Sequence, residues 1–314
     1  MAADSKPPIA VLTGPTGTGK SDYALQLARE FPIEIVSADS AQVYRGLDIG
    51  SAKPDADTVA RVPHHLIDLV EPTASYSAGQ FVRDATDAIA DIEARGRVPL
   101  LVGGTMLYLR ALISGMAILP KASEPIRAEI DADAKRLGWP ALHTRLAAVD
   151  AAAAARIHPN DAQRIQRALE VHAVGGRPIS ELQRVTTPTL AREFLVTALI
   201  PGDRARLHAS LAQRFENMMA AGLLEEVRTL YARGDLTDEN PSIRAVGYRQ
   251  LWSHVAGACS LETAVERAVA ATRQLAKRQM TWLRSMPNIR TVDPYDAQGF
   301  VGVRESLVAA FYLL

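Results

Sequence analysis

The first third of the chain alternates short apolar runs with longer stretches whose apolar residues recur at helical spacing. The runs IAVLT, IEIVSAD and VPLLVGG begin at residues 9, 33 and 98 and consist largely of aliphatic and β-branched side chains. Runs of this length, bounded by polar or glycine-rich segments, are typical of buried strands. Strands that alternate with helices form parallel sheets. The pattern therefore predicts an α/β fold with a parallel sheet flanked by helices.

The pattern changes after Pro120, where alanine-rich helical stretches are separated by glycine and proline. The next run typical of a strand is REFLVTALI, which begins at Arg192, and long helical patterns follow it. Clusters of glycine and proline end helices and mark connections. We therefore expect an all-helical insertion at 121–188 within an α/β core formed by 1–120 and 189–314.

Composition excludes several classes of protein. The 314 residues include one cysteine, Cys259, which can form neither an internal disulfide nor a cysteine-rich zinc site, so we expect a cytoplasmic protein. The N-terminal stretch MAADSKPP lacks the basic and apolar regions of a signal peptide. No segment is long and apolar enough to span a bilayer, so we expect no membrane partner. The formal net charge of zero argues against nonspecific binding to polyanions.

Basic residues are nevertheless concentrated in two places. The segment 267–290 contains no Asp or Glu but carries Arg267, Arg273, Lys277, Arg278, Arg284 and Arg290. A smaller group lies near His158 and consists of Arg156, Arg164 and Arg167. A charge run of this kind forms either a solvated helix face or a surface for RNA, and composition alone leaves both open.

The first predicted strand leads into the stretch GPTGTGKS, which matches the phosphate-binding pattern G-x-x-x-x-G-K-S/T. In such a loop the backbone N–H groups converge on phosphate oxygens, and the following helix adds the positive end of its dipole. Lys20 would place a positive charge on the phosphates, and the Ser21 hydroxyl could bind Mg²⁺. The motif predicts a P-loop NTPase-like sheet whose phosphate loop is formed by Gly14, Pro15, Thr16, Gly17, Thr18, Gly19, Lys20 and Ser21.

An ATP-hydrolysing P-loop protein also needs an acid after a second buried strand, to hold magnesium. The run VPLLV is followed instead by Gly103, Gly104 and Thr105. An acid does follow another strand, at Asp39, where it would lie at the ligand-binding edge of a parallel sheet. Asp39 could take a proton from a nucleophile, or it could cap the next turn. The residues alone leave both roles open.

Several longer motifs resemble one known family, the bacterial tRNA dimethylallyltransferases, also called tRNA isopentenyltransferases. The matching stretches are GPTGTGKS, SADSAQVYRGLDIGSAKP, PHHLIDLVEP, YSAGQF, LVGGTMLYLRAL, NDAQRIQRALEV, PSIRAVGYRQ and ATRQLAKRQMTWLR. They occur in family order and extend to about Arg284. The chain departs from the family pattern at Ala41, where a methionine is usual, and at Gly17 and Thr18, where Ala-Ser is common.

The resemblance implies transfer of a dimethylallyl group from dimethylallyl diphosphate to N6 of the adenosine immediately 3′ of the anticodon (position 37), in tRNAs that read codons beginning with U. The phosphate loop would then hold a diphosphate leaving group with Mg²⁺, so the acid used for ATP hydrolysis is not needed. Asp39 would act as the base and Thr105 would lie beside the target nucleotide, with Lys20 on the diphosphate. Arg214 is a further candidate for contacting the diphosphate.

The resemblance also implies contacts with the anticodon stem-loop of tRNA. The segments concerned take in both basic groups, which favours an RNA surface over a solvated helix face. The expected contact residues are Asp39, Ser40, Ala41, Gln42, Thr105, Arg127, Gln163, Arg164, Ile165, Gln166, Arg167, Arg244, Ala245, Val246, Gly247, Tyr248, Arg249, Lys277, Arg278, Gln279, Met280, Thr281, Trp282, Leu283 and Arg284. The family also suggests a monomer.

Three other functions share parts of this pattern. A small-molecule or nucleoside kinase would have the same loop and an acid after the second strand, but would release ADP. An adenylate isopentenyltransferase would modify a free nucleotide and would have little use for the helical insertion or the basic segment. A P-loop RNA-binding module without chemistry would not need Asp39.

Overall fold

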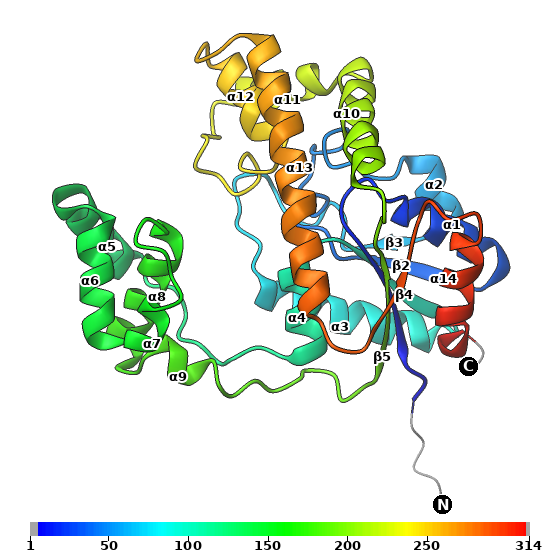
Figure 1. The fold of residues 1–314 in the computed structure, drawn as a ribbon, viewed down its shortest axis with the longest axis horizontal. Coiled ribbons are helices and arrows are strands. Elements are labelled where there is room, and N and C mark those ends of the chain that lie inside the picture. The colour runs from blue at the N-terminus through cyan, green and yellow to red at the C-terminus, as the bar shows by residue number, and fades with distance from the viewer. Residues whose placement is uncertain (1–5, 312–314) are drawn as a thin grey trace, which may run out of the picture. The chain divides into compact units, whose positions relative to one another are not determined.

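The computed structural model describes residues 6–311, which include a six-stranded parallel sheet (Figure 1). The strand order is β3-β2-β4-β1-β5-β6, and every strand pairs with its neighbours in parallel. The strands are β1 (Ile9–Thr13), β2 (Ile33–Ser37), β3 (His64–His65), β4 (Val98–Gly103), β5 (Phe194–Leu199) and β6 (Ile289–Val292). The predicted fold class, a P-loop NTPase-like parallel sheet with flanking helices, is confirmed.

The strands form because both faces of the sheet are covered by helices. All residues of β1, β2 and β4 are buried. On one face, Ala10 and Leu12 of β1 belong to a core cluster with Leu27 of helix α1 and Leu307 of helix α14. Strands buried on both faces read as near-continuous apolar runs, which is why these segments were visible in the sequence.

Nine helices and a short 3₁₀ turn accompany the sheet within the described residues 6–114 and 190–311. The helices are α1 (Lys20–Glu30), α2 (Ala56–Arg61), α3 (Ala78–Ala94), α4 (Met106–Ser114), α10 (Arg204–Ala220), α11 (Leu223–Ala232), α12 (Tyr248–Val255), α13 (Leu261–Ser285) and α14 (Gly299–Leu307), followed by the turn η1 (Val308–Ala310). Helices α11, α12 and α13 share a second core cluster built around Tyr248 and Trp252. No helix within residues 6–311 has the length and apolar character needed to cross a membrane.

The chain divides into two compact units, Met1–Arg110 with Leu190–Leu314, and Ala111–Thr189. The second unit contains α5 (Glu124–Leu137), α6 (Trp139–Val149), α7 (Ala151–Ala154), α8 (Ala162–Gly175) and α9 (Ile179–Leu182). Its helices enclose a core of their own, which includes Ile130, Leu146 and Ile165. The sequence predicted this insertion at 121–188, whereas the division by contacts falls within α4 and again at Thr189.

Candidate active site

The phosphate loop, residues 14–21, connects β1 to α1 and depends on glycine at two crowded points. Gly14 has a φ of 150° and Gly17 a φ of 79°. A Cβ atom at Gly14 would lie 2.7 Å from the carbonyl oxygen of Leu199, and one at Gly17 would lie 2.6 Å from Leu211. Only glycine fits such positions without moving the neighbouring elements, so β5 and α10 fix the path of the loop.

Lys20 begins α1 and points back over the phosphate loop. Its ammonium donates a hydrogen bond to the carbonyl oxygen of Pro15 at 2.8 Å, and the hydroxyl of Thr18 donates to the same oxygen at 2.8 Å. Burial lowers the pKa of Lys20 from 10.5 to about 8, while Asp39 opposes that change and Arg214 adds to it. The pKa of Lys20 therefore depends first on burial and then on two charged residues from other elements.

Arg214, on α10, lies near both the phosphate loop and the acid that follows β2. It lines a hollow of about 480 Å³ together with Gly17, Thr18 and Gly19 of the loop. Burial lowers the pKa of its guanidinium, and the charges of Asp39 and Asp22 act in the opposite direction. The structure thus brings Lys20, Arg214 and Asp39 within electrostatic reach of one another.

Asp39 follows β2 and uses one of its two carboxylate oxygens to shape the next turn. Its Oδ1 accepts hydrogen bonds from the backbone N–H groups of Ala41 at 2.8 Å and Gln42 at 3.4 Å. Its Oδ2 has no hydrogen-bond partner among residues 6–311. The capping role and the role of proton acceptor, which the sequence left as alternatives, are compatible because they use different oxygens.

Thr105 lies beside this turn at the end of the adjacent strand β4. Its hydroxyl oxygen accepts a hydrogen bond from the N–H of Ser40 at 3.0 Å, and its own N–H donates to the carbonyl of Ala38 at 3.1 Å. The approach requires Gly103, because a Cβ there would lie 2.2 Å from the carbonyl oxygen of Ala38. The two strand ends therefore present Asp39 and Thr105 together.

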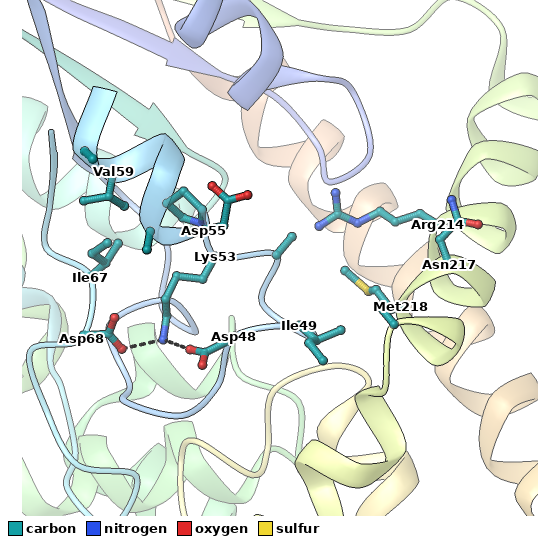
Figure 2. A pocket seen from close by; sticks show the side chains of 15 residues that line it. Asp48, Ile49, Lys53, Asp55, Val59, Ile67, Asp68, Arg214, Asn217 and Met218 are labelled. Atoms are coloured by element: carbon teal, nitrogen blue, oxygen red, sulfur yellow. Dashed lines mark hydrogen bonds and ion pairs between the residues drawn. The ribbon is translucent and has the colours of Figure 1, made fainter. Parts of the chain in front are cut away.

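A cavity of about 1020 Å³ opens beside Arg214, between the segment 48–68 and α10 (Figure 2). Much of its wall is apolar and includes Ile49, Val59, Ile67 and Met218. Such a wall suits an alkyl group whose charged end is held by Arg214.

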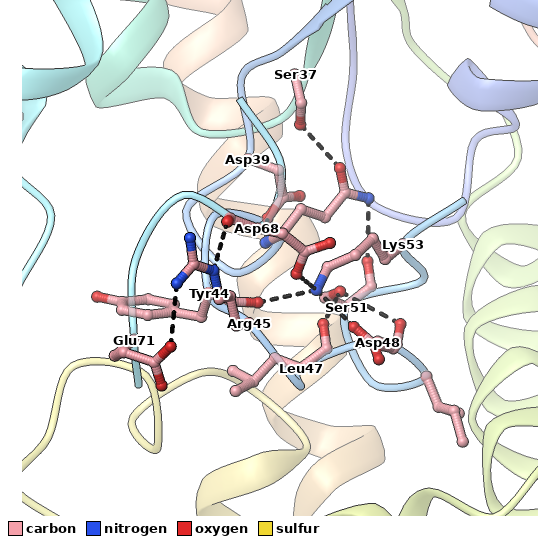
Figure 3. Close-up of polar contacts among 12 residues, drawn as sticks. Ser37, Asp39, Tyr44, Arg45, Leu47, Asp48, Ser51, Lys53, Asp68 and Glu71 are labelled. Carbon is pink, nitrogen blue, oxygen red and sulfur yellow. Dashed lines mark hydrogen bonds and ion pairs between the residues drawn. The ribbon is translucent and has the colours of Figure 1, made fainter. Parts of the chain in front are cut away.

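The polar side of this wall is held by Lys53, whose side chain is buried (Figure 3). Its ammonium binds the carbonyl of Tyr44 at 2.8 Å, Asp48 at 2.5 Å and Asp68 at 2.6 Å. Ala52 and Asp68 both have positive φ angles, of 51° and 53°. Non-glycine residues reach such angles at a cost, so the Lys53 contacts stabilise a strained wall.

Gln42 ties this wall to the site. Its Oε1 accepts a hydrogen bond from the hydroxyl of Ser37 at 2.8 Å, and its Nε2 donates to the carbonyl oxygens of Ser51 at 3.3 Å and Ala52 at 3.1 Å. The amide predicted to contact tRNA is thus occupied inside the protein. Of the neighbouring residues that were also predicted to contact tRNA, Ser40 is exposed and Ala41 is half-buried.

Helix α13 presents the predicted RNA contacts on one side only. Lys277, Arg278, Thr281 and Arg284 are exposed, and Trp282 is half-buried with the guanidinium of Arg110 5.6 Å from its ring. The structure corrects the prediction for Gln279, Met280 and Leu283, whose side chains are buried and pack inside the protein.

The segment 244–249 likewise contains both exposed and buried residues among its predicted RNA contacts. Arg244 and Arg249 are exposed, with Arg244 in an ion pair to Glu239, and Ala245 and Val246 are half-buried. Gly247 and Tyr248 are buried, so the predicted contact through the Tyr248 side chain is corrected. The Tyr248 hydroxyl binds Glu226 instead.

Within the helical unit, several predicted RNA contacts have partners inside the protein. Arg127 and Arg167 both bind the buried carboxylate of Glu170, at 2.9 and 2.6 Å. Gln166 donates to Asp131 and Arg164 pairs with Asp161, while Gln163 is exposed. Ile165 is fully buried in the core of the unit, which corrects its predicted role as a contact.

Sequence reasoning missed two structural roles near the site. Glu226 accepts hydrogen bonds from the N–H groups of Asp48, Ile49 and Gly50, and Gln279 binds the phosphate loop through the N–H of Thr16. No local pattern in the sequence signals such contacts, because their partners lie more than a hundred residues away along the chain.

A phosphate loop that faces an acid and a hydroxyl at two neighbouring strand ends defines a transferase site on a P-loop-type α/β fold. The family model described as IPP transferase matches residues 42–286, and one described as isopentenyl transferase matches residues 7–71. The chain belongs to the IPP transferase family.

Relatives and solved structures agree with this assignment. The tRNA dimethylallyltransferase of Bordetella petrii is 56% identical over 293 residues, covering 92% of this chain and 93% of that protein. The tRNA dimethylallyltransferase of Chromobacterium violaceum is 54% identical over 309 residues, covering 97% and 94%. The crystal structure of a tRNA isopentenylpyrophosphate transferase from Bacillus halodurans matches with a TM-score of 0.71 at 34% identity, covering 98% and 97% of the two chains. A eukaryotic dimethylallyltransferase acting on tRNA matches with a TM-score of 0.79 at 30% identity, covering 93% of this chain and 75% of that one.

Proposed function

We propose that the protein transfers a dimethylallyl group from dimethylallyl diphosphate to N6 of the adenosine immediately 3′ of the anticodon, position 37, in tRNAs that read codons beginning with U. The observation that carries this proposal is that Asp39, whose turn contacts Thr105, lies within electrostatic reach of both Lys20 and Arg214. This arrangement supports the proposal, because Asp39 would accept a proton close to the groups that would hold the diphosphate.

Asp39 supplies the base. An exocyclic adenine amine is a weak nucleophile because its lone pair is delocalised into the ring. Oδ2 accepts the N6 proton as the carbon–nitrogen bond forms, while Oδ1 remains bonded to Ala41 and keeps the carboxylate in place. The hydroxyl of Thr105 accepts a hydrogen bond from the N–H of Ser40 in the turn that follows Asp39. From there it can form a hydrogen bond with the target adenine.

The leaving group is held by the phosphate loop. As the carbon–oxygen bond breaks, negative charge develops on diphosphate, where Lys20, Arg214 and the loop N–H groups stabilise it. The apolar wall formed by Ile49 and Met218 receives the alkyl group and keeps water from an allylic carbon that carries partial positive charge.

Mg²⁺ fits this site only as a partner of the diphosphate. No group of three or more His, Cys, Asp or Glu side chains able to hold a metal occurs in residues 6–311. Ser21, exposed at the start of α1, offers one hydroxyl, so the ion would take its other ligands from diphosphate oxygens and water. When bound, it would neutralise charge on the leaving group.

The RNA surface consists of the exposed basic residues of α13 and of segment 244–249. The target base must leave the anticodon loop to reach Asp39, so the reaction requires an extruded nucleotide. Exposed cations such as Lys277 and Arg278 would hold the RNA backbone while the base enters. We expect the chain to act as a monomer in the cytoplasm.

Replacing Asp39 with Asn tests the proposal. The amide keeps an oxygen for the N–H of Ala41 but cannot take a proton, so the rate of transfer to unmodified tRNA should fall by about 10²- to 10⁴-fold. Binding of the prenyl donor should change by less than about threefold, because the positive groups on the diphosphate remain. Asp57→Asn, an exposed acid in α2, is the matched control. Asp39→Asn with a normal rate, measured by mass of the prenylated nucleoside, would show that another group is the base.

The same assay separates the competing functions. A kinase would consume ATP and form ADP with an alcohol substrate, and an adenylate isopentenyltransferase would modify free AMP in the absence of tRNA. An RNA-binding module would bind tRNA and leave it unmodified. We expect the assay to yield prenylated tRNA, with no ADP formed from ATP and no prenylated AMP.

A further inference from the structure

Gln279 is a buried polar residue that the reaction outlined above does not use. It lies in α13 with 8% of its surface exposed, between the exposed Arg278 and the buried Met280. Burying an amide is unfavourable unless its oxygen and nitrogen both find partners. Both do, and the partners belong to the two halves of the site.

One partner lies in the phosphate loop and the other in the turn before Thr105. Gln279 Oε1 accepts a hydrogen bond from the N–H of Thr16 at 2.9 Å, and Gln279 Nε2 donates to the carbonyl of Gly104 at 2.8 Å. The turn rests directly on the amide, because a Cβ at Gly104 would lie 2.5 Å from Nε2. A single side chain therefore bridges the loop that holds the donor and the turn that faces the acceptor.

The chemistry of the bridge requires glutamine. One end must accept a proton from a backbone N–H and the other must donate one to a backbone carbonyl, which a primary amide does and a carboxylate does not. Asparagine is one carbon shorter, so from the same backbone position it would reach at most one partner.

We infer that Gln279 is a positioning residue for prenyl transfer, because its amide bridge fixes the separation between the phosphate loop and the Gly104–Thr105 turn. This inference rests on the proposed function. In a displacement reaction the carbon of the donor and the nitrogen of the acceptor must meet in line, and small errors in that geometry cost large factors in rate. The residue acts through Thr16 and Gly104 and touches neither substrate.

Gln279→Met tests the inference, since methionine keeps the length and apolar stem of the side chain but makes neither hydrogen bond. The expected result is a fall in kcat of about 10- to 100-fold, with the KM for tRNA changed by less than about threefold because the exposed cations of α13 are intact. Gln274→Met, an exposed residue of the same helix, is the matched control and should leave kcat unchanged. A kcat for Gln279→Met within twofold of the unmodified protein would overturn the inference.

A second measurement does not depend on activity. Hydrogen exchange of peptides that cover 14–20 and 103–106 should speed up by about tenfold or more in Gln279→Met, because the bridge that restrains both segments is lost. Peptides from β6 and α14 should not change, and neither should any peptide in Gln274→Met. Unchanged exchange at both site segments would overturn the inference even if the protein proved to transfer no prenyl group.

If Gln279→Met does not fold, Gln279→Glu provides the same test. The carboxylate still accepts from Thr16 but cannot donate to Gly104, and it adds a negative charge beside the phosphate loop. We expect a raised KM for the donor and faster exchange of 103–106 with 14–20 still protected. Wild-type kinetics and exchange in Gln279→Glu would contradict the bridge.

Discussion

The hydroxyl group of Tyr248 donates a hydrogen bond to Oε1 of Glu226 across 2.5 Å. The same carboxylate accepts the backbone N–H groups of Asp48, Ile49 and Gly50 at 3.1, 2.8 and 3.2 Å. Burial raises the pKa of Tyr248 well above its usual range, and the charge and hydrogen bond of Glu226 raise it further. Helices α11 and α12 thereby hold the loop that forms part of the cavity wall beside Arg214.

Tyr248→Phe should lower the free energy of unfolding by about 1.5–3 kcal/mol, the usual worth of a hydrogen bond to a charged group. The apolar ring is retained, so packing in the core does not change. Tyr231→Phe, at an exposed tyrosine, is the control and should have little effect. Denaturant unfolding measures both, and equal stability of the two variants would contradict the assignment.

Tyr248→Phe should also leave tRNA affinity within about twofold of the unmodified protein, because the lost hydroxyl is buried and is not an RNA contact. A filter-binding or anisotropy titration decides this. A large loss of tRNA affinity in a Tyr248→Phe variant that remains stable would instead support the tRNA contact that the sequence predicted for Tyr248.

Diphosphate binding should weaken as pH rises through about 8, the pKa to which burial lowers Lys20. Below that pH the free protein carries the ammonium, and above it the protein must take up a proton to bind the anion. The logarithm of affinity should therefore fall with a slope approaching one per pH unit above the pKa. Calorimetric titration with inorganic diphosphate measures this dependence.

Lys20→Met is the control for that experiment, because it retains only the ionisation of the ligand itself. We expect weaker binding at neutral pH and a flatter profile above pH 8 than in the unmodified protein. Two profiles of equal slope would show that another group titrates.

Arg214→Gln should raise the donor KM by about 10- to 100-fold, since a desolvated guanidinium on a diphosphate contributes about 1.5–3 kcal/mol. The repulsion that Arg214 exerts on Lys20 is also removed, so the pKa of Lys20 should rise and the pH profile should move upward. Arg204→Gln, exposed at the start of the same helix, is the control. A raised KM without any shift of the profile would place Arg214 farther from Lys20 than the structure does.

Lys277→Ala combined with Arg278→Ala should weaken tRNA binding and reduce its dependence on salt. Each phosphate contact that is lost lowers the slope of log affinity against log salt by about 0.7–0.9. Binding of the prenyl donor should not change. Arg29→Ala with Arg61→Ala removes the same charge from exposed positions on α1 and α2, and this control should keep the slope. Equal slopes in the two double variants would remove α13 from the RNA surface.

Four of the six strands were visible in the sequence because they are largely apolar runs of which most residues are buried. The two edge strands were not. β3 contains only His64 and His65, and β6 places the exposed Arg290 and Thr291 at its centre, so neither has the composition of a buried strand. Edge strands are short and polar in many sheets, and for them the alternation of side chains is a weak signal.

The site was predictable where local sequence determines it. The spacing of the glycines in the phosphate loop indicates its backbone conformation. Asp39 and Thr105 come shortly after apolar runs, which indicates that they lie at the ends of strands. Glu226 and Gln279 could not be found in that way, since their roles depend on partners brought close by the fold. The same limit explains why whole segments such as 277–284 were predicted as contacts although a helix can present only part of each turn to solvent.

The near contact between Gly103 and Ala38 has a consequence for what this protein can evolve into. ATP-hydrolysing relatives of the fold carry an acid after the corresponding strand, but any side chain at Gly103 would collide with the neighbouring carbonyl, and one at Gly104 would collide with Gln279. An acid at Gly103 would have to displace the backbone of Ala38, and an acid at Gly104 would have to displace the amide of Gln279. At Gly103 the acid used for ATP hydrolysis is therefore excluded by backbone packing, unless the ends of β2 and β4 move apart.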